Sequence, residues 1–161
     1  MDAAIQLGFR FFAYVLFGLT MEVVFAVTGI ERMVGAPIPR RVPKRYLEGW
    51  VSLYMAPLHG LGVLFGVEVM HDLIRAWPLP ARYLVWCLAF TGAEWAYGWL
   101  QDKLLGFHTW DYYALSRWRM GKRGYSLWTL LPGWGLAGLL IEVYSDLMRH
   151  LSPHVAVYFL G

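Results

Sequence analysis

Charged side chains are scarce in this sequence: Asp, Glu, Lys and Arg make up 16% of the 161 residues, whereas hydrophobic residues make up 58%. A soluble domain has about 25% charged and roughly 45–50% apolar residues, so this composition argues against a soluble globular protein. Cysteine is nearly absent as well. The single thiol, Cys87, lies in an apolar run, cannot form an internal disulfide and is expected to be a buried structural group.

An excess of one charge sign is also missing, because the net charge is only +3 and the basic residues are scattered. We therefore expect no nucleic-acid partner. The chain has no nucleotide-binding motif, so a role in ABC transport would require a separate ATPase as a partner. Aromatic residues, in contrast, reach 17% with nine Trp. Such rings settle at membrane–water interfaces, and the lipid bilayer is the expected surrounding.

Four apolar runs are long enough to cross a bilayer, which takes about 20 helical residues. The backbone of a segment in lipid must satisfy its own hydrogen bonds, so the runs are helices. The sequence predicts an all-α, polytopic bundle of four transmembrane helices in one domain, 1–161. The predicted spans are residues 8–30, 49–74, 81–101 and 125–148, with a kink at Pro57 and a short interfacial tail over 151–161. No cleavable signal precedes the first run, so we expect it to remain as a span.

The basic residues of the predicted loops indicate an orientation. Residues 31–48 and 102–124 hold five Lys or Arg each, whereas the other side holds only Arg10, Arg75, Arg82 and Arg149. Because Lys and Arg in short loops favour the cytoplasmic side, both loops should lie there. The prediction is an integral protein, in the plasma (inner) membrane, with its N and C termini outside.

Four of the six glutamates lie inside the predicted spans, one in each: Glu22, Glu68, Glu94 and Glu142. A carboxylate at the bilayer centre costs about 2.5–3.5 kcal/mol on insertion scales, so one in every helix indicates a polar interior. At about 1.5 Å rise per residue, Glu22 and Glu94 lie roughly 10–12 Å inside the cytoplasmic boundary, and Glu68 and Glu142 lie roughly 24–28 Å from it, near the outer one, with His59 between. Three interpretations stay open: protonated carboxyl groups that hold helices together, a site for a substrate, ion or proton, or interfacial residues with no specific role.

The sequence gives little support for a metal site or for nucleophilic catalysis. Glu68 and His71 form one Glu-x-x-His pattern, but a di-metal bundle needs two copies with two further glutamates at the same level. We therefore expect neither a metal nor another cofactor. Ser52 and Ser126 have no base placed beside them by the sequence, which leaves nucleophilic catalysis without a motif.

Several pieces, in order from Tyr14 to Glu142, resemble the transmembrane protein 229 family and the overlapping ABC-transporter type IV, or CmpB-like, group. They are Tyr14-x3-Gly18-x3-Glu22, the run Ser52 to Gly60, Glu94-Trp95-x2-Gly98, Trp110-Asp111-Tyr112, and Gly124 followed by Trp134 and Glu142. The chain departs from the family pattern at His59, Tyr113 and Gly121, where the family tends to have Tyr, Ser and Asn. The resemblance implies a multi-pass membrane protein.

The candidate site consists of Glu22, Glu94, Asp111, Trp110, Tyr112 and His59, with a second level at Glu68, His71 and Glu142. Asp111 is expected to cap the end at which Glu22 and Glu94 meet. Three functions remain open at this point. They are a permease-like or accessory transport subunit with a partner membrane subunit or separate ATPase, a membrane scaffolding or assembly protein, and a membrane-embedded enzyme acting on a lipid or isoprenoid headgroup. The enzyme is disfavoured because it lacks a nucleophile or metal set.

Overall fold

The computed structural model describes residues 1–161 and contains helices but no strands, which confirms the all-α prediction. The α-helices are α1 (Asp2–Thr28), α2 (Ile30–Val34), α3 (Ala56–Leu61), α4 (Glu68–Ile74), α5 (Leu79–Leu105) and α6 (Leu131–Leu160). A π-helical segment, Gly62–Val67, joins α3 to α4 without a break. Short 3-10 turns occupy Lys44–Tyr46, Leu53–Met55, Asp111–Leu115 and Trp128–Leu130.

The second predicted span begins later than expected and is not kinked by Pro57. Residues 49–52 are not helical, and Ser52 caps the following turn by accepting a hydrogen bond from the Tyr54 N–H at 3.3 Å. Pro57 lies in the first turn of α3, where its missing N–H removes no intrahelical bond. The irregularity comes instead from the π-helical segment that starts at Gly62.

The fourth predicted span is displaced, and the expected separate tail is part of it. Helix α6 starts at Leu131 rather than at Tyr125, and it continues through Pro153 to Leu160. A proline inside a helix leaves the carbonyl four residues earlier without its N–H partner. Here the Ser152 hydroxyl donates to that carbonyl, Arg149 O, at 3.1 Å, so the helix continues where the sequence suggested an end.

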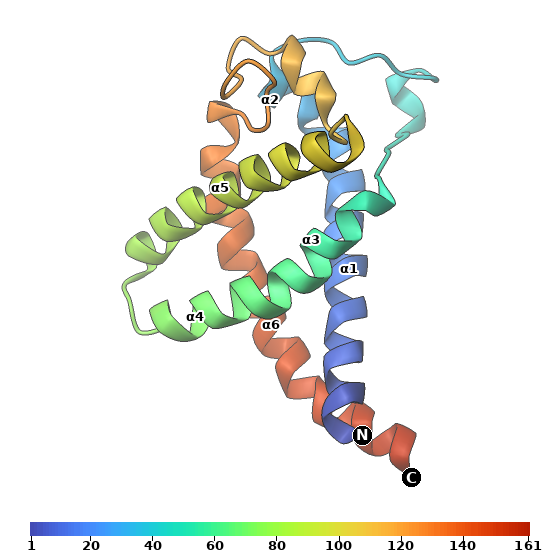
Figure 1. Cartoon of the computed structure of the whole chain (residues 1–161), viewed down its shortest axis with the longest axis vertical. Helices are drawn as coiled ribbons and strands as arrows, with labels where there is room; N and C mark the ends of the chain where they lie inside the picture. The colour runs from blue at the N-terminus through green and yellow to red at the C-terminus, as the bar shows by residue number, and fades with distance from the viewer.

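Helix α6 joins the other long helices, because it packs against both α5 and α1, while α1 also packs against α3 (Figure 1). The loops between α2 and α3 and between α5 and α6 gather at one end of the molecule, and both termini lie at the other (Figure 1). One apolar core, which includes Tyr14 and Trp86, lies among α1, α4, α5 and α6. A second core, which includes Trp110 and Leu127, lies beneath the loops.

The distribution of polarity over this fold is the reverse of that in a soluble protein. Large apolar side chains such as Phe12, Phe65 and Leu88 are 66–71% exposed, whereas Glu94 and Glu142 are buried. Two helical stretches, Asp2–Thr28 and Leu53–Ile74, are long and apolar enough to cross a membrane, and only 17% and 33% of their apolar windows are buried. Helices α5 and α6 do not meet that criterion. The low burial distinguishes the two stretches from core helices of a soluble protein and supports a membrane protein.

Close helix contacts at glycines provide a test of the packing. A Cβ atom at Gly138 of α6 would overlap the buried Trp86 ring, whereas one at Gly92 of α5 would meet nothing within 4 Å. We predict that Gly138→Ala lowers the free energy of unfolding by about 1–3 kcal/mol through overpacking. The control, Gly92→Ala, should raise it by about 0.5–1 kcal/mol through helix propensity. Thermal unfolding in detergent measures both, and a Gly138→Ala variant as stable as wild type would contradict the packing.

Candidate functional site

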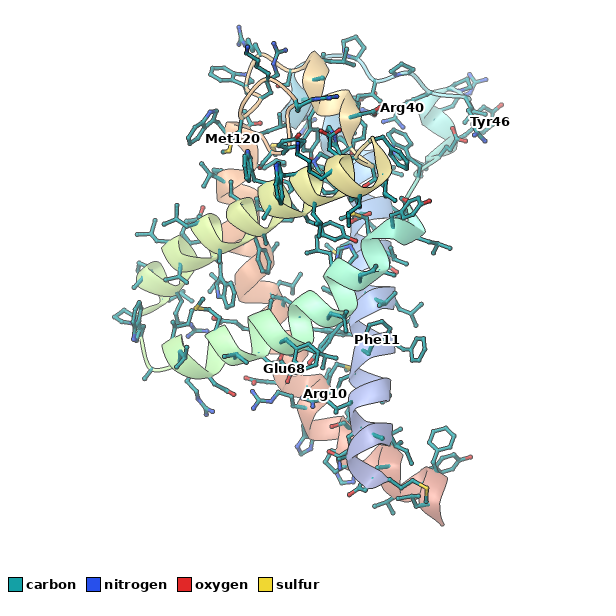
Figure 2. All side chains as sticks on the ribbon, viewed as in Figure 1. Arg10, Phe11, Arg40, Tyr46, Glu68 and Met120 are labelled. Carbon is teal, nitrogen blue, oxygen red and sulfur yellow. The ribbon has the colours of Figure 1, made fainter.

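The four glutamates come from four different helices and face partners on others. Glu22 belongs to α1, Glu68 to α4, Glu94 to α5 and Glu142 to α6. Glu68 lies beside Arg10, away from the loop end where Arg40 and Met120 lie (Figure 2). Their hydrogen-bond partners divide the four carboxylates into two sets. Glu68 and Glu142 pair with arginines, whereas Glu22 and Glu94 do not.

Glu68 is held by donors from α1. The Arg10 guanidinium donates to Glu68 Oε2 at 2.5 Å, and the Tyr14 hydroxyl donates to Oε1 at 2.6 Å. The same hydroxyl lies 3.3 Å from the Ser145 hydroxyl of α6. The Glu68 side chain is 10% exposed, so this charge is paired in a largely dry place. Its contacts join α1, α4 and α6.

Glu142 is the most buried of the four, with a side chain that is 1% exposed. Two nitrogens on one edge of the Arg82 guanidinium, Nε and Nη2, donate to it, and Trp86 Nε1 donates to Oε1 at 2.7 Å. His71 Nδ1 lies 3.4 Å from Oε1, and His71 Nε2 lies 3.2 Å from Asp146. Arg10 and Arg82, which loop counting treated only as topological charges, are thus the partners of the second-level carboxylates.

Glu94 differs because no cation contacts it. Its carboxyl group receives hydrogen bonds from the Ser126 hydroxyl, from Trp134 Nε1 at 3.1 Å and from the Tyr113 hydroxyl at 3.2 Å. Glu94 and Tyr113 are both buried, and Ser126 is completely so. None of these three donors was among the predicted site residues. Ser126 and Tyr113 lie in the loop between α5 and α6, where the sequence spacing gives no sign of which helix they approach.

Glu22 pairs with His59, whose Nε2 lies 2.7 Å from Glu22 Oε1. The His59 ring packs directly on Gly18, where a Cβ atom would overlap it. Both side chains are partly exposed, at 20% for His59 and 29% for Glu22. His59 therefore lies at the level of Glu22 rather than between the two levels.

Tyr112 connects the two carboxylates of this level electrostatically. Burial raises the pKa of Tyr112, and the negative charges of Glu22, Glu94 and Asp111 raise it further. Burial likewise raises the pKa of Tyr113, with further contributions from Glu94 and Glu22. Both carboxylates thus act on the same pair of phenols.

The rest of the predicted loop triplet has other surroundings. Asp111 is exposed and has no hydrogen-bond or ion-pair partner, so it does not cap the carboxylates as expected. Trp110 is buried against Gly98, and its Nε1 donates to the Tyr125 carbonyl at 2.8 Å. Trp110 therefore fixes the loop on α5, and Tyr113 takes the place at Glu94 that we had assigned to Asp111.

A hollow of about 390 Å³ opens on the loop side of Tyr112. Arg40 organises its wall: the guanidinium donates to Glu31 and to the carbonyls of Ala26 and Glu48, and it lies 5.2 Å above the Trp50 ring. Arg40 and Lys44 lower the pKa of Glu31, with the Lys44 hydrogen bond as the larger cause. Tyr112 lines this hollow and also lies close enough to Glu22 and Glu94 to be affected by their charges.

A model of the family described as "Putative ABC-transporter type IV" matches residues 9–159. The chain belongs to this family. The match confirms the CmpB-like resemblance, and it extends over all four glutamates of the type IV chain. Neither a curated protein nor a solved structure matches the chain. Membership of the type IV family is consistent with a transport-related membrane protein.

The donors around the two buried carboxylates of this type IV protein differ in kind. Arg82 and Trp86 can only donate hydrogen bonds, so Glu142 is suited to the ionised state alone. At Glu94 only Trp134 is an obligatory donor, because the hydroxyls of Ser126 and Tyr113 can turn and accept instead. The surroundings of Glu94 can therefore follow a change in its protonation, and those of Glu142 cannot.

This difference gives a stability test on the type IV protein. Glu142→Gln places an amide N–H₂ against donors and leaves Arg82 without its counter-charge, which should lower the free energy of unfolding by about 3 kcal/mol. The double variant Arg82→Gln/Glu142→Gln removes the unpaired charge and should recover part of that loss. Denaturation in detergent measures both. A single Glu142→Gln variant within about 1 kcal/mol of wild type, the usual net contribution of one hydrogen bond, would contradict a fixed ion pair.

Proposed function

We propose that this protein crosses the membrane four times, through α1, α3 with α4, α5 and α6. We further propose that it serves as a permease-like or accessory transport subunit in which the Glu94 carboxyl exchanges a proton or a small cation. The observation that carries the proposal is the donor set of Glu94. It is the buried glutamate with no cationic partner, and two of its three donors can reverse their hydrogen bonds.

The neighbours of Glu94 support exchange at the same level. Glu22 and His59 form a second hydrogen-bonded pair, in which the histidine ring nitrogen donates or accepts according to its tautomer. Tyr112, which the charges of Glu22 and Glu94 affect, also lines the hollow at the loop end. Ionisable residues inside membrane segments commonly mark proton or ion pathways.

The two other candidate functions make different demands. A scaffolding protein needs the carboxylates only as fixed contacts, which suits the ion pairs of Glu68 and Glu142 but leaves the reversible donors at Glu94 unused. A headgroup enzyme needs a nucleophile or a metal, and the structure contains no group of three or more His, Cys, Asp or Glu side chains that could hold a metal ion. The Ser126 hydroxyl does meet a carboxylate, that of Glu94, which the sequence did not predict, but Ser126 is completely buried and out of reach of a headgroup. The transport proposal accounts for both sets of carboxylates, because the ion pairs of Glu68 and Glu142 hold the helices while Glu94 exchanges.

The arrangement of the ends supports the proposed topology. Both termini lie at one end of the molecule and the Lys- and Arg-rich loops at the other (Figure 1), as an even number of crossings requires. Because Lys and Arg in short loops favour the cytoplasmic side, the loops should lie in the cytoplasm and the termini outside. The proposed membrane is the plasma (inner) membrane. In this orientation the hollow at Tyr112 opens to the cytoplasm.

Single-cysteine labelling tests this topology, because the only native thiol is the buried Cys87. In a Cys87→Ser background we place one cysteine each at Asp2, Gly161, Arg45 or Lys122. A membrane-impermeant maleimide should label the two terminal variants on intact cells and the two loop variants only after permeabilisation. Labelling of one terminus but not the other would refute four crossings, and labelling of Arg45→Cys on intact cells would reverse the orientation.

The transport proposal is tested at Glu94. Glu94→Gln retains hydrogen bonding, since the hydroxyls of Ser126 and Tyr113 can accept from the amide, but it cannot exchange a proton or bind a cation. We predict a melting temperature close to that of wild type together with loss of growth support in a host whose own copy is deleted. Glu94→Leu should instead lower stability, by about 1–3 kcal/mol for each buried group left unpaired.

The control is Asp2→Asn, which removes one carboxylate charge from an exposed position at the opposite end of the molecule and should have no effect in either assay. Full growth support from Glu94→Gln would overturn the proposed exchange and leave Glu94 as a packing group. Equal loss of stability in the Gln and Leu variants would likewise count against reversible donors at this site.

A further inference from the structure

The loop between α5 and α6 contains a second, differently built feature. Residues 116–128 form a tight hairpin in which Met120 N–H donates to Ser126 O at 2.8 Å and Trp128 N–H donates to Trp118 O at 3.0 Å. Gly121 and Gly124 make the turns with φ angles of 73° and 70°, which other residues rarely adopt. Backbone pairing therefore fixes where the side chains of the hairpin point.

Buried anchors hold the hairpin against the rest of the protein. Ser116, Ser126 and Leu127 are at most 1% exposed, and Gly124 lies so close to Tyr113 that a Cβ atom would be 3.0 Å from the Tyr113 carbonyl carbon. The Arg119 guanidinium donates to the Ala114 carbonyl at 2.7 Å, which orients that side chain. The hairpin therefore presents its surface side chains in a fixed arrangement.

Three cations of the hairpin line an open hollow of about 660 Å³. Arg117, Arg119 and Lys122 surround it together with Leu115 and Gly121. None of the three lies within 4.0 Å of a carboxylate, whereas neighbouring Arg123 has Asp102 and the cations Arg10, Arg40 and Arg82 each have a glutamate. Three like charges on one rigid surface repel each other unless an anion joins them.

Exposed apolar side chains occur on and next to the same hairpin, and one of them, Leu115, lines the hollow. Leu115 is 57% exposed, Trp118 43% and Trp128 60%, and the Arg117 guanidinium lies 4.7 Å above the Trp118 ring. Trp favours the membrane–water interface, and clusters of Lys and Arg beside a membrane helix attract anionic headgroups. A ligand that suits both features carries a phosphate and acyl chains on one molecule.

We propose that this hollow binds the phosphate of an anionic phospholipid, with Arg117, Arg119 and Lys122 around the headgroup and Trp118, Trp128 and Leu115 against the adjoining acyl region. The site rests on the membrane placement in the proposed function but not on exchange at Glu94. A free phosphate would use only the cations, whereas a lipid also uses Leu115 and the exposed Trp side chains of the hairpin. The two sources therefore predict different competition.

Native mass spectrometry of the full chain in detergent tests the site. The micelles hold equal amounts of phosphatidylglycerol, which is anionic, and phosphatidylcholine, which is neutral overall. Wild type should retain phosphatidylglycerol preferentially. Arg117→Gln/Arg119→Gln/Lys122→Gln should bind it at least about tenfold more weakly, since each cation near an anionic headgroup contributes appreciably. The matched control, Arg32→Gln/Arg45→Gln/Lys103→Gln, removes the same charge from exposed positions outside the hollow and should bind as wild type does.

Two results would overturn the proposal. Equal loss in both triple variants would show general attraction by surface charge and overturn a specific site. Displacement of the lipid by inorganic phosphate at matched concentration would overturn the lipid as ligand in favour of free phosphate. If the triple variant folds poorly, the double variant Arg117→Gln/Lys122→Gln replaces it, because it leaves the Arg119 contact with Ala114 intact. The double variant should also lose selectivity for phosphatidylglycerol. Glu94→Gln should retain the lipid, so failure of the exchange proposal and failure of this one are distinguishable.

Discussion

A carboxylate buried among apolar helices needs hydrogen-bond donors, and in this protein those donors come from neighbouring segments of the chain. Glu68 joins α4 to α1, and Glu142 joins α6 to α5. Because an unpaired buried charge costs several kcal/mol, the helices are held in one register by these contacts. The apolar exterior cannot provide such specificity, since one lipid-facing surface resembles another. The polar interior therefore determines which helices meet and where.

The two levels of carboxylates satisfy this requirement in different ways, and the proposed function rests on that difference. Arg10 and Arg82 each form an ion pair with their glutamate. Glu94 instead has hydroxyl partners on the loop between α5 and α6, and Glu22 has His59. The loop that supplies Ser126 and Tyr113 to Glu94 also carries the cationic hairpin. Lipid bound at the hairpin would therefore contact the same loop that supplies the hydrogen-bond donors of Glu94.

Much of the fold could be predicted from the sequence, because apolar runs and family motifs are local signals. The all-α class and the family were predicted correctly, and one glutamate per long helical run was visible from spacing alone. The partners were not, since Arg82 meets Glu142 across 60 residues and Tyr113 meets Glu94 through an irregular loop. Asp111 was misplaced because a triplet in a 3-10 turn points its side chains in three directions. The length of α6 was underestimated because Ser152 compensates for Pro153.

The central claim, that Glu94 changes protonation while Glu142 does not, is tested most directly by infrared difference spectroscopy of the purified protein across a pH series. A protonated carboxylic acid has a C=O stretching band that a carboxylate lacks. Because all eleven Asp and Glu side chains can contribute to this band, we predict that Glu94→Gln removes one pH-dependent component of it, while the melting temperature remains that of the wild type. A titrating band that persists unchanged in Glu94→Gln, or no titrating band in wild type, would contradict the account.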